Sequence, residues 1–248
     1  MPFRFSKHEI DTVNDATEEV VKLNPPGLVM EAGSTVVRGI QGAHLLNTLL
    51  SRLARDARLL MPAIQLLGGD VYVHQYKVNF KHAFVGDIWP WHRDFEYWHR
   101  LDGIAKPELV SVMVALDEIS EFNGPLFFIP GSHHIQEASD RAYPRHLTGD
   151  EVHKAFSADL PFQLTKEEVS ALLLSSEIVA PKGPIGLTLF FAANVAHASL
   201  PNLTATSRRL LIITYNRTDN LPSNKARRPE YISARTFTPL KPLKRFTI

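Results

Sequence analysis

The chain contains no cysteine among its 248 residues. Disulfide bonds, thiolate metal sites and cysteine nucleophiles are therefore excluded. A lack of cysteine is compatible with a reducing compartment, and residues 1–7 lack the apolar core of a signal peptide. We therefore expect a cytoplasmic location.

Long apolar runs and a strong net charge are also missing. No stretch approaches the roughly 18 consecutive apolar residues of a membrane span. The formal net charge is only +1, with a sequence pI near 8.0, so no strong field favours nucleic acid or an acidic membrane surface. We expect a small-molecule substrate and neither a nucleic-acid nor a membrane partner; the oligomeric state does not follow from the chain.

Apolar residues make up 44% of the chain, enough for one globular domain over residues 1–248. The first part, about 1–68, is predicted to be mainly helical. Ser6 is a suitable cap for a helix over roughly 7–22, and a second helix is predicted over about 42–66. Short strands are expected near 28–30 and 35–37. The apolar stripe of the second helix should face a sheet; it consists of Leu45, Leu46, Leu49, Leu50 and Leu53.

From residue 70 the hydrophobic period changes to that of β-strands. Strands are predicted over 71–79, 109–116, 126–129, 186–191 and 208–216, and the turn signals between them favour a sandwich or jelly roll. A polar stretch over about 133–180 interrupts these strands and has the length of a lid-like insertion. Two capping-box patterns lie inside it, at Thr148-x-x-Glu151 and Thr165-x-x-Glu168.

Two histidines and one aspartate form the most specific candidate site. On an extended strand His92 and Asp94 point to the same face, while Arg93 points away. His197 follows a later apolar run and can supply a third ligand from another strand. Such a set leaves metal positions open, as a non-haem Fe(II) oxygenase requires. The alternative is a buried, hydrogen-bonded cluster without a metal.

The residues around this set resemble the phytanoyl-CoA dioxygenase superfamily, and within it most closely ectoine hydroxylases and free L-amino-acid hydroxylases such as leucine hydroxylase. The resemblance covers about residues 28–240. It implies a mainly β, double-stranded β-helix (jelly-roll, cupin-like) core, Fe(II) bound by His92, Asp94 and His197, and 2-oxoglutarate and dioxygen as cosubstrates. The matching segments are Gln75-Tyr76-Lys77-Val78-Asn79, Trp91-His92-x-Asp94-Phe95-x-x-Trp98, Asp102-Gly103, Asn123-Gly124-Pro125-Leu126 and Pro130-Gly131-Ser132-His133.

The far carboxylate of 2-oxoglutarate needs a cation, preferably the planar fork of an arginine. Arg208 opens a predicted strand after His197 and matches the family's cosubstrate arginine. Arg209 should point to the opposite face and is the natural control. The resemblance also assigns Asn79, Trp91 and Ser199 to the cosubstrate pocket.

For the primary substrate, the resemblance points to Gln75, Trp98 and Arg228, of which Arg228 could hold an α-carboxylate. The alternative for Arg228 is a solvated run of basic residues. We expect hydroxylation of an unactivated C–H bond in a small polar substrate, a free or lightly modified L-amino acid. Two alternatives stay open: hydroxylation, desaturation or cyclisation of a larger or carrier-tethered secondary metabolite, and a non-catalytic cupin-like binding module.

Overall fold

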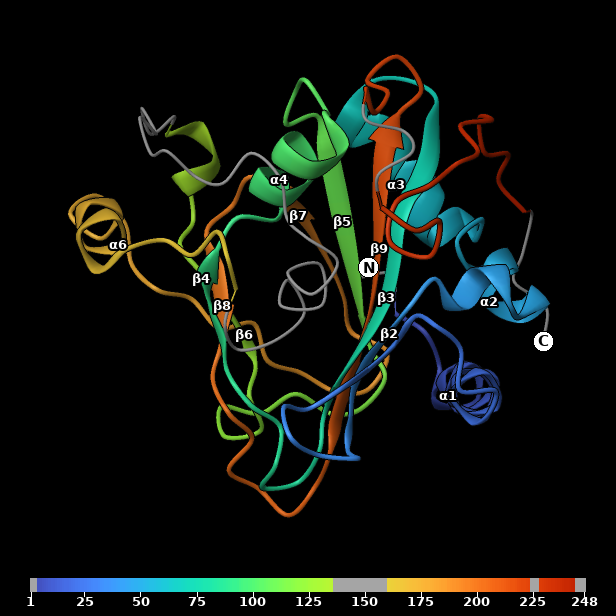
Figure 1. The fold of residues 1–248 in the computed structure, drawn as a ribbon, viewed down its shortest axis with the longest axis horizontal. Coiled ribbons are helices and arrows are strands. Elements are labelled where there is room, and N and C mark those ends of the chain that lie inside the picture. Colours follow the sequence, from blue (N-terminus) through green and yellow to red (C-terminus); the bar gives the residue numbers. More distant parts are fainter. Residues whose placement is uncertain (1–3, 136–159, 224–227, 244–248) are drawn as a thin grey trace.

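Two antiparallel β-sheets face each other in the computed structural model, which describes residues 4–135, 160–223 and 228–243 (Figure 1). The larger sheet has the strand order β1-β2-β3-β9-β5-β7, and the smaller has the order β4-β8-β6. This pair of sheets is the predicted jelly roll. The larger sheet comprises β1 (Leu28–Met30), β2 (Val37–Gln41), β3 (Val71–Lys81), β9 (Arg208–Arg217), β5 (Leu109–Ala115) and β7 (Thr188–Ala192).

The smaller sheet consists of β4 (Trp89–His92), β8 (His197–Ser199) and β6 (Leu126–Phe128). Its short strands face the long β3 and β9 across the interior of the molecule (Figure 1). Because side chains alternate along a strand, every second residue of these strands enters the space between the sheets. The fold thus brings polar residues from distant parts of the chain into one interior.

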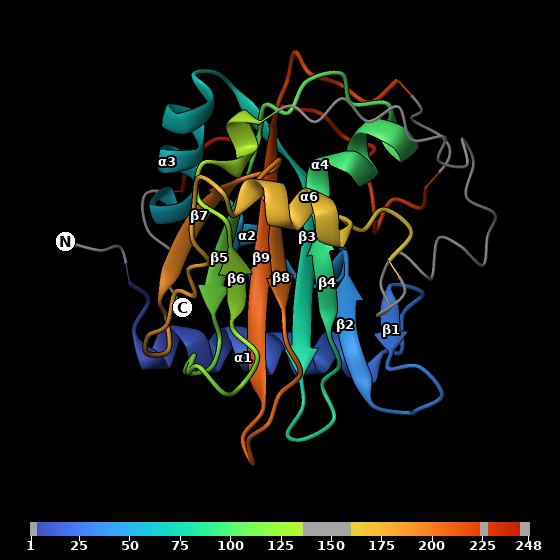
Figure 2. The same ribbon diagram turned by 90° about the vertical axis from the view of Figure 1, so that its left-hand side faces the viewer.

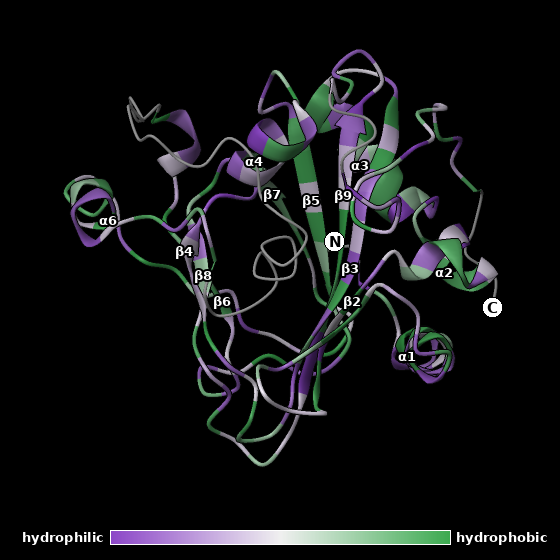
Figure 3. Cartoon of the chain, viewed as in Figure 1, coloured by the Kyte–Doolittle hydropathy of each residue, from purple (hydrophilic) through white to green (hydrophobic). Residues whose placement is uncertain are grey.

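Helices cover the outer face of the larger sheet (Figures 1 and 2). They are α1 (Lys7–Lys22), the 3-10 turn η1 (Ala43–Leu45), α2 (Thr48–Leu53) and α3 (Ala57–Leu67). Strand β5 is buried along its whole length and is largely hydrophobic in Figure 3, because its outer face meets these helices. None of the helices in the described ranges is both long and apolar enough to cross a membrane.

The remaining helical segments lie around the smaller sheet and the mouth of the interior. Helix α4 (Asp94–Tyr97) runs directly into the π-helical turn η2 (Trp98–Asp102), and η3 (Ser132–His134) follows β6. Helix α6 (Lys166–Leu172) lies outside the smaller sheet (Figure 1). The Thr165–Glu168 capping box is present at its start, whereas the pattern at Thr148 lies outside the described residues.

The predicted continuous helix over 42–66 is wrong. The side chain of Asn47 caps α2 by accepting the backbone N–H groups of Leu49 and Leu50, and Asp56 caps α3 in the same way. These caps divide the segment into η1, α2 and α3. As a result Leu45 and Leu46 face outward, with 48% and 50% of their surface exposed. The helix over 7–22 is confirmed with its Ser6 capping box, whereas the strand expected at 35–37 is β2, beginning at Val37.

Candidate metal and cosubstrate site

His92, Asp94 and His197 meet in the space between the sheets, and all three are buried. Their candidate ligand atoms lie within 4.8 Å of one another. Nε2 of His92 is 3.7 Å from Oδ1 of Asp94, and Nε2 of His197 is 4.0 Å from Oδ2. Ligand atoms lie about 2 Å from a bound transition metal, so atoms this close can share one ion after small side-chain adjustments.

The local backbone differs from the sequence prediction. Strand β4 ends at His92, and Asp94 is the first residue of α4 rather than part of the strand. Arg93 between them keeps an extended conformation, with φ −120° and ψ 125°. His92 and Asp94 therefore still point to the same side. Arg93 points away, as predicted, and its guanidinium donates to the backbone carbonyls of Ser132 and Asn194.

Backbone carbonyls orient both imidazoles. Nδ1 of His92 lies 2.7 Å from the Pro90 carbonyl oxygen, and Nδ1 of His197 lies 3.1 Å from that of Val195. A carbonyl can only accept, so each Nδ1 carries the proton and each Nε2 presents a lone pair toward Asp94. This second layer of contacts is typical of histidines that bind a metal.

The protonation states also suit metal binding. Burial, with a contribution from His197, lowers the pKa of His92 to about 3, and burial likewise lowers the pKa of His197. Burial opposes ionisation of Asp94, but the ammonium of Lys77 and the two imidazoles outweigh it and hold the pKa at about 2. At neutral pH the site therefore offers two neutral imidazoles and one carboxylate, the forms in which these side chains bind metals.

The walls of the surrounding pocket contain three buried polar atoms without a hydrogen-bond partner among the described residues: Oε1 of Gln41, Oδ1 of Asn79 and Nε of Arg208. Buried polar groups are rarely left unpaired, because each loses its hydration without compensation. Three such atoms around one pocket indicate a polar ligand. The pocket also contains all three candidate metal ligands.

Arg208 is the most deeply buried cation among the residues that line this pocket. Only 1% of its surface is exposed, and no described carboxylate lies within salt-bridge distance. Burial therefore lowers its pKa to about 9, still high enough to keep the guanidinium charged at neutral pH. Nη2 donates to the carbonyl of Gly124 and to Oγ of Ser199, the latter at 3.2 Å. An unpaired buried cation of this kind is suited to an anionic ligand.

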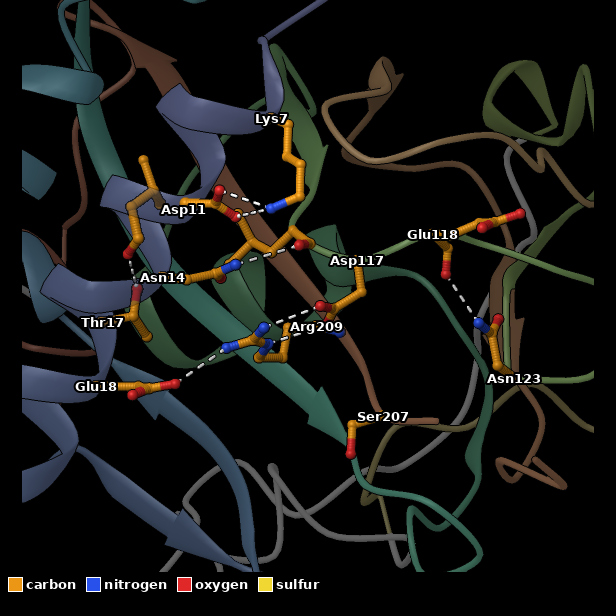
Figure 4. A network of polar contacts seen from close by, with 12 residues as sticks. Lys7, Asp11, Asn14, Thr17, Glu18, Asp117, Glu118, Asn123, Ser207 and Arg209 are labelled. Atoms are coloured by element: carbon orange, nitrogen blue, oxygen red, sulfur yellow. Dashed lines mark hydrogen bonds and ion pairs between the residues drawn. The ribbon is translucent and has the colours of Figure 1, made fainter. Parts of the chain in front are cut away.

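Arg209, the predicted control, points to the other face of β9. Its guanidinium forms two hydrogen bonds of 2.9 Å with Asp117 and lies 3.5 Å from Glu18 of α1 (Figure 4). The contrast between neighbouring arginines follows from strand alternation. Arg209 is neutralised on the helix side, whereas Arg208 faces the pocket without a carboxylate partner.

Trp91, which the resemblance assigns to the cosubstrate side, does not line this pocket. The register between β4 and β8 shifts between the pairs Trp89–Ser199 and His92–His197, so β4 contains one extra residue. This bulge turns both Trp89 and His92 into the pocket. Trp91 instead packs against the apolar cluster beneath α6. Trp89 therefore occupies the place in the pocket wall that the sequence assigned to Trp91.

The three predicted substrate residues, Gln75, Trp98 and Arg228, all line the same pocket. Arg228 is not part of a solvated basic run, because only 5% of its surface is exposed. Its Nε and Nη2 bind the two oxygens of Asp102 in a fork, at 2.7 and 2.5 Å, leaving Nη1 as the atom that could reach a substrate. Gln75 donates to the carbonyl of Ile232, and Trp98 is almost fully buried.

Lys77 is a pocket residue that the sequence reasoning missed. Its Nζ lies 3.4 Å from both carboxylate oxygens of Asp94. The strand pattern could have identified it. Every second residue of β3 lies on the same face, and this face includes Gln75, Lys77 and Asn79. Tyr97, Leu126 and Leu160 also line the pocket and complete an aromatic and aliphatic wall.

The comparisons with known proteins agree with this geometry. The profile of the phytanoyl-CoA dioxygenase family (PhyH) matches residues 4–210. The chain is 35% identical to L-proline trans-4-hydroxylase of Streptomyces griseoviridis over 243 residues, covering 98% of this chain and 90% of that protein. It is 33% identical to ectoine dioxygenase of Nocardia farcinica, covering 88% of this chain and 73% of that protein.

The same likeness extends to crystal structures of EctD from S. alaskensis. The structure with bound Fe superposes with a TM-score of 0.81 at 30% identity, covering 98% of this chain and 82% of that one. The structure with 2-oxoglutarate and 5-hydroxyectoine gives a TM-score of 0.80 at 32% identity, covering 97% and 80%. Both the fold and the resemblance expected from the sequence are therefore confirmed.

Proposed function

The chain belongs to the phytanoyl-CoA dioxygenase family and is an Fe(II)- and 2-oxoglutarate-dependent hydroxylase, and from this premise we propose that it hydroxylates a free L-amino acid of the size class of L-proline. The observation that carries the proposal is the likeness to L-proline trans-4-hydroxylase, which extends over 98% of this chain. Because the chain belongs with these dioxygenases, the alternative of a non-catalytic binding module is not supported.

His92, Asp94 and His197 are proposed to hold the iron from one side, because their ligand atoms converge and their protonation states suit a metal. When bound, the iron and 2-oxoglutarate together activate dioxygen for oxidation of an unactivated C–H bond. Arg208, supported by Ser199, is proposed to bind the far carboxylate of 2-oxoglutarate. The buried Oδ1 of Asn79 can accept from a polar group in the same space.

The substrate side of the pocket suits an amino acid. Lys77 and Arg228 line it, and Asp102 already occupies Nε and Nη2 of Arg228, which leaves Nη1 as its donor for a carboxylate. A carboxylate that also contacts Lys77 would lie close to the triad, since Lys77 is 3.4 Å from Asp94. Trp89, Tyr97 and Trp98 line the same pocket and reduce access of water to the reacting C–H bond. The pocket therefore combines charge for an α-carboxylate with an apolar wall for a small ring or side chain.

The test is a screen of free L-amino acids, including L-proline, with Fe(II), 2-oxoglutarate and air. Mass spectrometry should detect the gain of one oxygen atom in one of them, together with an equal amount of succinate. The amide of the active amino acid is the matched control, because it lacks the carboxylate that Lys77 and Arg228 would bind. Activity restricted to amides or carrier-tethered substrates would contradict the proposal.

A further inference from the structure

Lys81, at the end of β3, is a buried basic residue behind the cosubstrate side of the pocket. It lies opposite Arg208 in the β3–β9 register, and only 1% of its surface is exposed. Its ammonium donates to three backbone carbonyls: Leu200 at 2.5 Å, Ser199 at 3.4 Å, and Asp87. These acceptors match the three donors of a lysine ammonium, so its hydrogen-bonding capacity is satisfied without a carboxylate.

Each of these contacts reaches a segment that carries part of the site. Asp87 precedes β4, which contains His92, and Ser199 and Leu200 follow His197 along β8 and the chain beyond it. One ammonium therefore connects the two segments that supply the histidines. Removing it would leave these partly buried acceptor carbonyls without their donor and let these segments shift relative to β3.

The alkyl part of Lys81 makes a fourth contact, with Gly124. A Cβ atom on Gly124 would approach Cδ of Lys81 to 2.8 Å and the Leu200 carbonyl oxygen to 2.6 Å, so only glycine allows this close packing. The carbonyl of Gly124 accepts from Nη2 of Arg208 and, at 2.9 Å, from Oγ of Ser199. Lys81 thus supports the peptide group that orients the guanidinium of Arg208.

The charged residues near Lys81 also link it to an anion bound beside Arg208. Arg38, Lys81 and Arg208 are all at most 2% exposed, while Glu31 is the buried acid of the group and already pairs with Arg38 at 2.7 Å. Burial and the neighbouring cations Arg208 and Arg38 lower the pKa of Lys81 to about 6. With this pKa much of the Lys81 amine is uncharged at neutral pH when no ligand is bound, and an anion bound beside Arg208 favours its ammonium form.

We propose that Lys81 is a positioning residue for the cosubstrate: it holds Gly124 and Ser199 so that Arg208 is aimed at the far carboxylate of a 2-oxo diacid. The inference rests on the proposed role of Arg208 and adds a second basic residue, outside the pocket wall, that supports selectivity for a dicarboxylate through its hydrogen bonds. Replacing Lys81 should therefore weaken binding of the far carboxylate of 2-oxoglutarate and leave binding of its 2-oxoacid end unchanged.

The test compares two ligands that differ at that far end. Protein loaded with Fe(II) without oxygen is titrated with 2-oxoglutarate and with 2-oxopentanoate, in which a methyl group replaces the far carboxylate. The visible charge-transfer band of the bound 2-oxoacid reports both affinities without turnover. In Lys81→Met we expect the Kd for 2-oxoglutarate to rise about tenfold and that for 2-oxopentanoate to change less than about twofold; tenfold corresponds to about 1.4 kcal/mol.

Arg209→Met is the matched control, since it removes a cation from the same strand pair on the outer face and should leave both affinities unchanged. Lys81→Gln covers the case in which the methionine variant does not fold, because its shorter amide has only two donors and cannot serve all three carbonyls; the same loss of preference is expected. Equal weakening of both ligands, or an unchanged preference, would overturn the inference and leave Lys81 a purely structural role.

The variant Arg208→Met tests the proposed role of Arg208 separately from the proposed role of Lys81. It should abolish the preference for 2-oxoglutarate over 2-oxopentanoate. If it does not, the proposed cosubstrate role of Arg208 fails, and the inference about Lys81 fails with it. A lost preference in Arg208→Met with an intact preference in both Lys81 variants overturns only the role of Lys81.

Discussion

At the scale of single residues, burial and the presence of partners decide which charges are available for chemistry. Arg208 and Arg209 are neighbours of the same type, yet Arg209 is neutralised by Asp117 and Arg208 has no described carboxylate partner. Burial also keeps His92 and His197 neutral, while Lys77 keeps Asp94 ionised. The same side chains on an exposed surface would titrate near their ordinary values and would not form a preset metal site.

The first residue-scale prediction concerns Asp94. Asp94→Ala removes the only carboxylate of the triad, so Fe(II) and 2-oxoglutarate should no longer produce the visible charge-transfer band, and succinate formation should stop. Glu96→Ala is the control, because Glu96 lies on the same helix but pairs with Arg100, at 2.7 Å. A normal band in Asp94→Ala would show that the metal is bound elsewhere.

The second residue-scale prediction concerns the two arginines at the start of β9. Arg208→Ala should raise the KM for 2-oxoglutarate by at least about thirtyfold, since breaking a buried charged contact costs about 2 kcal/mol or more. Arg209→Ala should leave that KM unchanged, because its guanidinium faces α1 and Asp117. Steady-state kinetics with varied 2-oxoglutarate measure both. Equal effects on the KM for 2-oxoglutarate would show that Arg208 does not bind this cosubstrate in the way proposed.

At the scale of secondary-structure elements, one extra residue in β4 decides the composition of the pocket wall. The bulge between Trp89 and His92 places Trp89 next to Ser199 in the sheet and sends Trp91 outward to the cluster beneath α6. The sequence pattern cannot reveal such a bulge, because it depends on the register with β8, which lies about a hundred residues away in the chain.

The bulge predicts different consequences for the two tryptophans. Trp89→Ala should raise the KM for 2-oxoglutarate or for the amino acid, because Trp89 lines the pocket. Trp91→Ala should lower the melting temperature through loss of packing against Ile129 and Leu172 while leaving both KM values near those of the wild type. Kinetics combined with thermal unfolding distinguish the two. A KM effect confined to Trp91→Ala would contradict the observed register.

The C-terminal segment after residue 228 is joined to the body of the fold by a buried ion pair. Arg228→Met should lower the free energy of unfolding by about 3–5 kcal/mol, because Asp102 would remain buried without its main partner. Adding Asp102→Asn should restore part of this loss by removing the unpaired charge. Urea unfolding of the single and double variants provides the comparison; additive losses would show that the pair is not coupled.

At the scale of the whole molecule, buried histidines link stability to pH. His44 stacks on Tyr76 with ring centroids 4.8 Å apart, and burial lowers its pKa to about 4. Between this value and the ordinary value of about 6.5, the unfolded chain binds more protons than the native one. The free energy of unfolding should therefore fall as the pH decreases through this interval.

His44→Phe tests this dependence away from the metal site. The variant keeps an aromatic ring beside Tyr76 but cannot take up a proton, so its stability should decrease less than that of the wild type between about pH 7 and pH 4.5. Urea unfolding at several pH values measures the two slopes. Parallel slopes would show that His44 is not among the groups responsible.

Much of the candidate site could be predicted from the sequence because its signals are local or chemical. The spacing of His92 and Asp94 and the arginine that opens β9 each identify a residue type and a face, whereas Gln75 and Asn79 of β3 were assigned by the family resemblance. The family resemblance pointed to Arg228, which lines the pocket, but its partner Asp102 was not foreseen. That pair joins residues 126 positions apart, and no local pattern encodes it.

The sequence by itself determined the ligand types, the helix over 7–22 and the order of the main strands, because capping, alternation and side-chain chemistry act over a few neighbouring residues. Only the tertiary structure decided that Trp89 replaces Trp91 in the pocket, that Lys77 lies beside Asp94, and that Lys81 stands behind Arg208. These outcomes depend on strand register and on packing between distant segments, which form only when the sheets come together.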